Sequence, residues 1–154
     1  MAVNQAPTFY VGDGSLIAYP SSAYGPNALD EMLIQLDGKI LLIGNTNYNQ
    51  HINILRYNSD GSVDNSFGPV QTYITANDAA LQADGKILIV GETANYDFGV
   101  VRYNPDGSLD EDFNNTPGQI GFRTFDLSIA DSATSIAIQS DGKILVGGAT
   151  NGGS

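Results

Sequence analysis

The chain has 154 residues, among them 18 Gly, 6 Pro and no Cys, and its length is typical of a single domain. Apolar residues make up 42 % of the chain, which supports a packed core, and the lack of cysteine excludes a disulfide framework and thiolate chemistry. The formal net charge of −11 argues against nucleic acid and anionic lipid as partners, because both require clustered Lys and Arg.

Three segments of the chain repeat one pattern almost unchanged. It reads IQLDGKILLIG at 34–44, LQADGKILIVG at 81–91 and IQSDGKILVGG at 138–148. A second pattern occurs twice, as ILRYNSDGSVDNSF at 54–67 and VVRYNPDGSLDEDF at 100–113. This recurrence indicates tandem repeats of roughly 50 residues. We divide the chain into an N-terminal partial repeat (1–27), repeat 1 (28–73), repeat 2 (74–130) and partial repeat 3 (131–154).

Each repeat is predicted to contain about four short antiparallel strands. The first strand covers Met32–Gln35, Ala79–Gln82 and Ser135–Gln139. The second covers Lys39–Ile43, Lys86–Val90 and Lys143–Val146. These second strands are continuous apolar runs, so we expect both of their faces to be covered. The third strand is placed at Asn53–Tyr57 and Phe98–Tyr103, and an edge strand at Val63–Phe67 and Leu109–Phe113.

Asp-Gly pairs mark the turns between these strands. Before the second strands they are Asp37-Gly38, Asp84-Gly85 and Asp141-Gly142, where we expect two-residue type I′ hairpins with φ > 0 at both positions. After the third strands, Asn58-Ser59-Asp60-Gly61 and Asn104-Pro105-Asp106-Gly107 carry the residues of four-residue β-turns. No helical apolar stripe interrupts the pattern, so we predict an all-β fold of β-propeller-type blades.

The motif DGKILxxG followed by RYNxDGSxDxxF resembles the delta-60 repeat family of bacterial and some viral proteins. Residues 37–44, 84–91 and 141–148 carry its first part, and residues 56–67 and 102–113 its second. The resemblance implies a propeller-type repeat of large secreted or surface-displayed proteins, with no catalytic activity or cofactor attached to the repeat. A closed propeller has about 4–8 blades, whereas this chain carries about three. We therefore expect either a longer parent chain or several copies that complete a ring or a stack.

Five of the six cations recur at fixed positions of the repeat. They are Lys39, Lys86 and Lys143 at the start of the second strands, and Arg56 and Arg102 in the third strands. We interpret the lysines as residues whose stems cover apolar surface, with an anion-binding ring as the alternative. Each arginine is expected to pair with a turn aspartate, from among Asp60, Asp64, Asp106 and Asp110.

The turn after the third strand of repeat 2 is rich in oxygen donors, which calcium prefers. Asp106, Asp110 and Asp112 are the candidate ligands, although their spacing is not that of the twelve-residue calcium loop. Asp-Gly turns also occur for backbone reasons alone. We therefore expect no cofactor, with calcium at these three aspartates as the alternative.

Loop tyrosines are the candidate ligand-binding residues. Tyr48 and Tyr96 follow the second strands of repeats 1 and 2 in equivalent loops, where amphipathic rings stack on sugars or contact a protein partner. The alternative is that they cap the ends of the sheets. No catalytic constellation stands out, so we expect a protein that is not an enzyme. The only candidates for hydrolysis are acids outside the repeated turns, Asp13, Glu92, Asp97 and Asp126.

The sequence thus favours a non-enzymatic structural or interaction module of a surface, adhesive or virion-type assembly. Unpaired strand edges favour self-association or membership of a longer chain. The alternative function is a carbohydrate-binding module that uses loop Tyr and Asn residues, with or without calcium. The segment MAVNQAPTFY lacks the features of a signal peptide, and no apolar run is long enough to insert into a membrane. The family resemblance nevertheless implies an extracellular, cell-surface or virion location.

Overall fold

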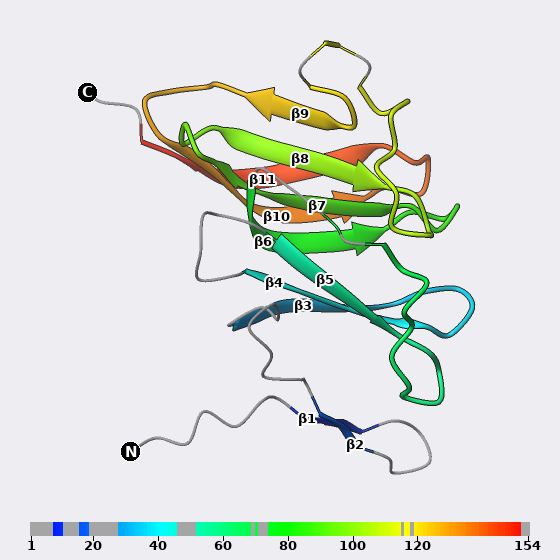
Figure 1. Ribbon diagram of the computed structural model, residues 1–154. Coiled ribbons are helices and arrows are strands. Elements are labelled where there is room, and N and C mark those ends of the chain that lie inside the picture. The colour runs from blue at the N-terminus through cyan, green and yellow to red at the C-terminus, as the bar shows by residue number, and fades with distance from the viewer. Residues whose placement is uncertain are drawn as a thin grey trace, which may run out of the picture.

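The computed structural model describes residues 8–10, 16–18, 28–45, 52–68, 70, 74–114, 116–117 and 119–151. All regular structure in these residues is β-strand (Figure 1). The two N-terminal strands, β1 (Thr8–Tyr10) and β2 (Leu16–Ala18), form a short antiparallel hairpin. In the part of the chain that is described, no helix has the length and apolar character needed to cross a membrane.

The remaining strands form three antiparallel sheets in which strands pair in chain order. The first sheet contains β3 (Ala28–Ile34), β4 (Ile40–Asn45) and β5 (Ile52–Tyr57). The second contains β6 (Ile74–Leu81), β7 (Ile87–Thr93), β8 (Phe98–Tyr103) and β9 (Phe122–Phe125). The third contains β10 (Asp131–Ile138) and β11 (Ile144–Thr150). These meanders are the blades of a propeller-type fold, as predicted.

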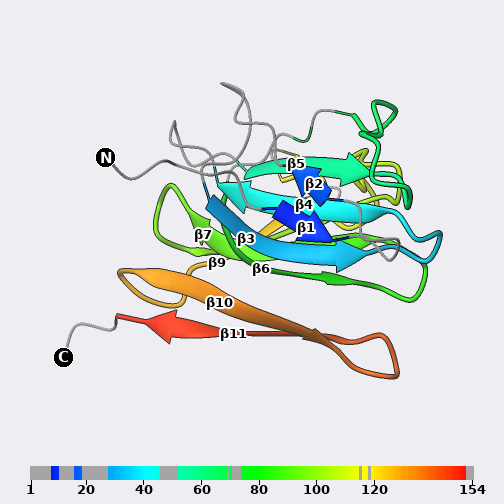
Figure 2. The ribbon, with the colours of Figure 1, turned by 90° about the horizontal axis from the view of Figure 1, so that it is seen from below.

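The second sheet lies between the other two, with β3–β5 on one side and β10–β11 on the other (Figure 2). The side chains of its strand β7 alternate between two apolar cores. Ile87 and Ile89 pack in a cluster shared with the first sheet, whereas Leu88 and Val90 pack in a cluster shared with the third. All four are fully buried, which confirms the prediction that this apolar run is covered on both faces. The same prediction is wrong for Lys143–Val146, because β11 belongs to an outer sheet and Leu145 is 51 % exposed.

The predicted two-residue hairpins are wrong, because the loops have three residues. Gly38 N donates to Gln35 O at 2.9 Å, and Gly38 has a φ of 83°, whereas Asp37 stays outside the left-handed region. A three-residue loop needs only one left-handed residue, and glycine adopts it without strain. The aspartate is then free to accept a hydrogen bond from Lys39 N at 3.2 Å. The loops that contain Gly85 and Gly142 have the same arrangement.

The predicted edge strands Val63–Phe67 and Leu109–Phe113 are also wrong. Each contributes only one bridge, Tyr57↔Val63 and Tyr103↔Leu109. Beyond the bridge the backbone turns, because each aspartate side chain accepts a hydrogen bond from the backbone N–H two residues later. Asp64 accepts from Ser66 N, and Asp110 accepts from Asp112 N. The fourth strand of the second sheet is β9 instead, which pairs with β8.

A β-bulge interrupts the first hairpin of each blade, opposite the last glycine of the DGKILxxG motif. In the second sheet, Ala76 pairs with Gly91, and the register shifts before the next pair at Asp78. The same shift follows the pair Leu29↔Gly44 and the pair Ala133↔Gly148. The motif therefore ends in glycine at the point where the bulged strand comes close to its partner.

Candidate functional site

Three charged side chains meet in the same way in the first two blades. In the repeat-1 triad (Lys39, Arg56, Asp64), one aspartate oxygen accepts hydrogen bonds from the lysine Nζ at 2.9 Å and from the arginine Nε at 2.8 Å. In the repeat-2 triad (Lys86, Arg102, Asp110), the corresponding distances from Nζ and Nε to the aspartate oxygen are 2.8 and 2.5 Å. The arginines thus pair with two of the four aspartates that the sequence offered. Asp60 and Asp106 instead accept hydrogen bonds within their own turns, from Ser62 and Ser108.

The surroundings of the two triad aspartates favour their ionised form. Asp64 accepts from the Ser66 hydroxyl at 2.6 Å, and this bond, together with the ammonium of Lys39, holds the pKa of Asp64 well below its ordinary value. Burial by itself raises the pKa of Asp110, but the hydrogen bonds from Lys86 and Arg102 outweigh it and lower that pKa. Both carboxylates therefore carry their charge at neutral pH, as the ion pairs require.

The protein should lose stability as the pH falls below about 4. Asp64 and Asp110 have pKa values below 3.8 in the folded protein, so the unfolded chain takes up protons first. The stability that these groups contribute is complete above the unfolded pKa and is lost as the pH falls through the folded one. Thermal unfolding measured from pH 6 down to pH 2.5 tests this. Asp110→Asn should flatten the profile and the exposed Asp112→Asn should not; equal effects would contradict it.

Beside the repeat-1 triad, three side chains hold a turn of the next blade. Arg56 Nη1 donates to Pro105 O at 2.7 Å, and Gln35 Nε2 donates to the same carbonyl at 3.1 Å. The ring of Phe67 lies 4.5 Å from the Arg56 guanidinium and packs against Gly107, where a Cβ would approach the ring to 2.8 Å. We call Gln35, Arg56 and Phe67 the first clamp. It joins two blades through a backbone carbonyl and a glycine, so it recognises the shape of the turn.

Repeat 2 carries the same three side chains, Gln82, Arg102 and Phe113, which we call the second clamp. Arg102 Nη1 donates to Gln82 Oε1 at 3.3 Å, and its guanidinium lies 4.5 Å from the Phe113 ring centroid. Within the described ranges, no turn lies against the second clamp in the way that residues 105–107 lie against the first. The clamps were not predicted, although the regular recurrence of Gln, Arg and Phe in the two motifs was a signal for them.

Of the two candidate ligand-binding tyrosines, Tyr96 lies within the described residues and Tyr48 lies outside them. Tyr96 lies at the tip of the β7–β8 hairpin, is 54 % exposed and has a φ of 63°, which is unusual for a bulky residue. The loop that it closes borders a shallow pocket of about 270 Å³, whose lining includes Asn95, Gln119 and Phe122.

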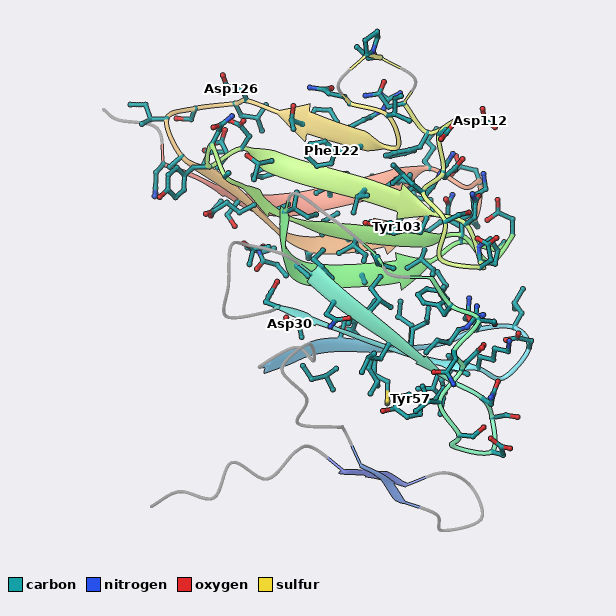
Figure 3. The ribbon with its side chains drawn as sticks, in the orientation of Figure 1. Asp30, Tyr57, Tyr103, Asp112, Phe122 and Asp126 are labelled. Atoms are coloured by element: carbon teal, nitrogen blue, oxygen red, sulfur yellow. The ribbon has the colours of Figure 1, made fainter. Side chains whose placement is uncertain are left out.

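The three aspartates predicted as calcium ligands are not brought together in a group. Asp106 closes its own turn, Asp110 belongs to the repeat-2 triad, and Asp112 is exposed. In the described part of the chain, the carboxylates that do converge are those of Asp97, Asp126 and Asp131. Asp97 and Asp126 were candidates as acids outside the repeat, but Asp131 was missed. Asp126 and Asp112 lie at opposite ends of the second sheet (Figure 3).

A comparison with protein families identifies the family of the chain. Among curated proteins, no match was found. A family described as Domain of unknown function (DUF5122) beta-propeller matches residues 35–67, 82–113 and 139–154. These segments contain both triads, and residues of both clamps. They make up more than half of the chain, and the protein therefore belongs to the DUF5122 β-propeller family.

Proposed function

We propose that the protein is a non-enzymatic structural module whose blades associate with further units, either copies of itself or blades of a longer chain. The observation that supports this proposal is the first clamp, in which Arg56 and Gln35 bind the carbonyl of Pro105 in the next blade. The second clamp has the same side chains in the same arrangement. It is therefore suited to hold an Asn-x-Asp-Gly turn that a further blade would supply.

Exposed apolar side chains on the two outer blades support association as well. Met32 and Ile34 on β3 are 42 % and 65 % exposed, and Leu145 on β11 is 51 % exposed. Leu36, in the loop after β3, is exposed too. Large apolar side chains that are exposed together mark interaction surfaces, and unpaired strand edges add backbone donors and acceptors.

The setting that we propose for this module is a surface, adhesive or virion-type assembly outside the cell. Its support is the resemblance of the two motifs to the delta-60 repeats of secreted and surface-displayed proteins. The charge of −11 is in keeping with a structural role, because the triads and turns use many of the aspartates for local hydrogen bonds.

The association is tested by sedimentation equilibrium across the micromolar range. We expect dimers or larger species, with Arg102→Lys weakening the association at least tenfold. Lysine keeps a cation beside Asp110 but lacks the second nitrogen that reaches a carbonyl. Glu111→Gln, which changes an exposed side chain of the same turn as Asp110, is the control and should leave association unchanged. A stable monomer at all concentrations would contradict self-association, and a binding assay with added repeat units would then decide the longer-chain alternative.

A carbohydrate-binding module is the second candidate, and the hairpin tip favours it. The left-handed backbone at Tyr96 presents an exposed ring in the loop that borders the pocket. Strained backbone at non-glycine residues is enriched at binding sites, and tyrosine rings stack on sugars. A glycan array probed with and without calcium tests this function, and the absence of any bound glycan in both conditions would dismiss it.

A further inference from the structure

Three carboxylates converge where the second blade leads into the third. Asp97 belongs to the β7–β8 hairpin, Asp126 follows β9, and Asp131 begins β10. One oxygen from each lies within 4.8 Å of the others. In the described residues, the ion pairs of lysine and arginine go to other aspartates. Like charges at this separation repel one another.

Asp131 is the most deeply buried carboxylate of this cluster. It is 1 % exposed, and its Oδ2 accepts hydrogen bonds from Leu127 N at 2.7 Å and Ser128 N at 2.8 Å. Its Oδ1 is buried and has no hydrogen-bond partner. A buried carboxylate oxygen without a partner is strongly unfavourable. The group that satisfies this oxygen must be a donor or a cation, and the two further carboxylates close to the Asp131 side chain favour a cation.

We propose that Asp97, Asp126 and Asp131 bind one calcium ion. Calcium prefers carboxylate oxygens at 2.3–2.6 Å, so two ligands on opposite sides of the ion stand about 4.6–5.2 Å apart. The oxygens of the cluster all lie within 4.8 Å of one another, close enough to contact the same ion. Calcium also accepts irregular ligand sets completed by water, which suits a site in which Asp126 is exposed and Asp97 is partly so. Magnesium demands a tighter octahedron and is the poorer fit.

The ion would fasten the third blade to the second. Asp131 N already donates to Tyr96 O at 2.5 Å, so the start of β10 touches the β7–β8 hairpin. Calcium bound by Asp97 and Asp131 would add a second link between the same two segments. The site lies outside the repeated motifs, so it is a feature of this one junction.

The test uses the full chain after treatment with a chelator, in 150 mM NaCl. Calorimetric titration with calcium should show one ion per chain with a Kd of about 10⁻⁴–10⁻³ M. Addition of 10 mM calcium should raise the Tm by about 3–10 °C. Asp97→Asn and Asp126→Asn should each weaken binding at least tenfold and remove the shift in Tm. Asp112→Asn, at the other end of the sheet, is the matched control and should bind calcium like the parent.

Two results would overturn the proposal. One is the absence of saturable binding up to 10 mM calcium, and the other is an equal loss of affinity in Asp97→Asn and Asp112→Asn, which would indicate diffuse attraction to an acidic surface. The Tm measured without calcium shows whether the variants are folded. In the presence of chelator, Asp97→Asn and Asp126→Asn should raise the Tm above that of the parent, because each removes one of the repelling charges.

Discussion

Replacing Gly91 by alanine should lower the free energy of unfolding by at least about 3 kcal/mol, at the upper end of what overpacking does. A Cβ at this position would overlap the carbonyl oxygen of Thr75 and lie 2.8 Å from its carbonyl carbon. Both atoms belong to the backbone of β6 at the bulge, so no side-chain rotation relieves the overlap. Urea unfolding followed by fluorescence measures the change, with a fall in Tm of roughly 6–12 °C as its thermal counterpart.

The chain offers a matched control for this substitution. A Cβ at Gly68 would meet no atom within 4 Å, so Gly68→Ala should change the free energy of unfolding by no more than about 0.5 kcal/mol. Gly148, which pairs opposite the bulge in the third blade, would place its Cβ against Ser132 O and 2.9 Å from the Cα of Ala133. Gly148→Ala should therefore behave like Gly91→Ala. A mild effect at Gly91 would show that the bulge yields and is not what requires the glycine.

The strands of the blades were predictable because their signals are local. The apolar run at Ile87–Val90 is buried on both faces, and the turn at 104–107 closes with Gly107 N donating to Asn104 O at 2.9 Å. The length of the Asp-Gly hairpin was mispredicted because Asp-Gly suits two loop types, and only the flanking register decides between them. The strand β9 was missed because Phe122–Phe125 has only four residues, which alternate between partly buried and exposed.

The candidate site was predictable only where it lies within one repeat. Arg102 and Asp110 are eight residues apart, and their pairing follows from the recurrence of both residues. The bond from Arg56 to Pro105 O joins residues 49 apart in different blades, and spacing within a repeat does not show which blade supplies a turn. The convergence of Asp97, Asp126 and Asp131 depends on the path of two loops, about which the repeat carries no information.

Arg56→Ala should destabilise the protein more than Arg102→Ala, by about 1.5–3 kcal/mol, which is the range for a hydrogen bond to a charged group. Both substitutions break a triad and remove a cation from a phenylalanine ring. Only Arg56 also donates to a carbonyl of the next blade, at 2.7 Å, and it is the more deeply buried of the two, at 7 % against 18 % exposed. The difference between the variants therefore includes the contribution of the joint between the blades, which the glutamine pair below tests by itself.

The measurement is urea unfolding at neutral pH and at a protein concentration low enough to suppress association, since Arg102 lies in the second clamp. Gln35→Ala and Gln82→Ala form a second matched pair, in which only Gln35 reaches Pro105 O, and the same order of effects is expected. Pro105→Ala keeps the carbonyl and should preserve the difference between the two arginine variants. Equal losses in Arg56→Ala and Arg102→Ala would mean that the triads alone stabilise the blades. The clamp would then contribute nothing to their association, and the proposed role of its counterpart in repeat 2 would lose its support.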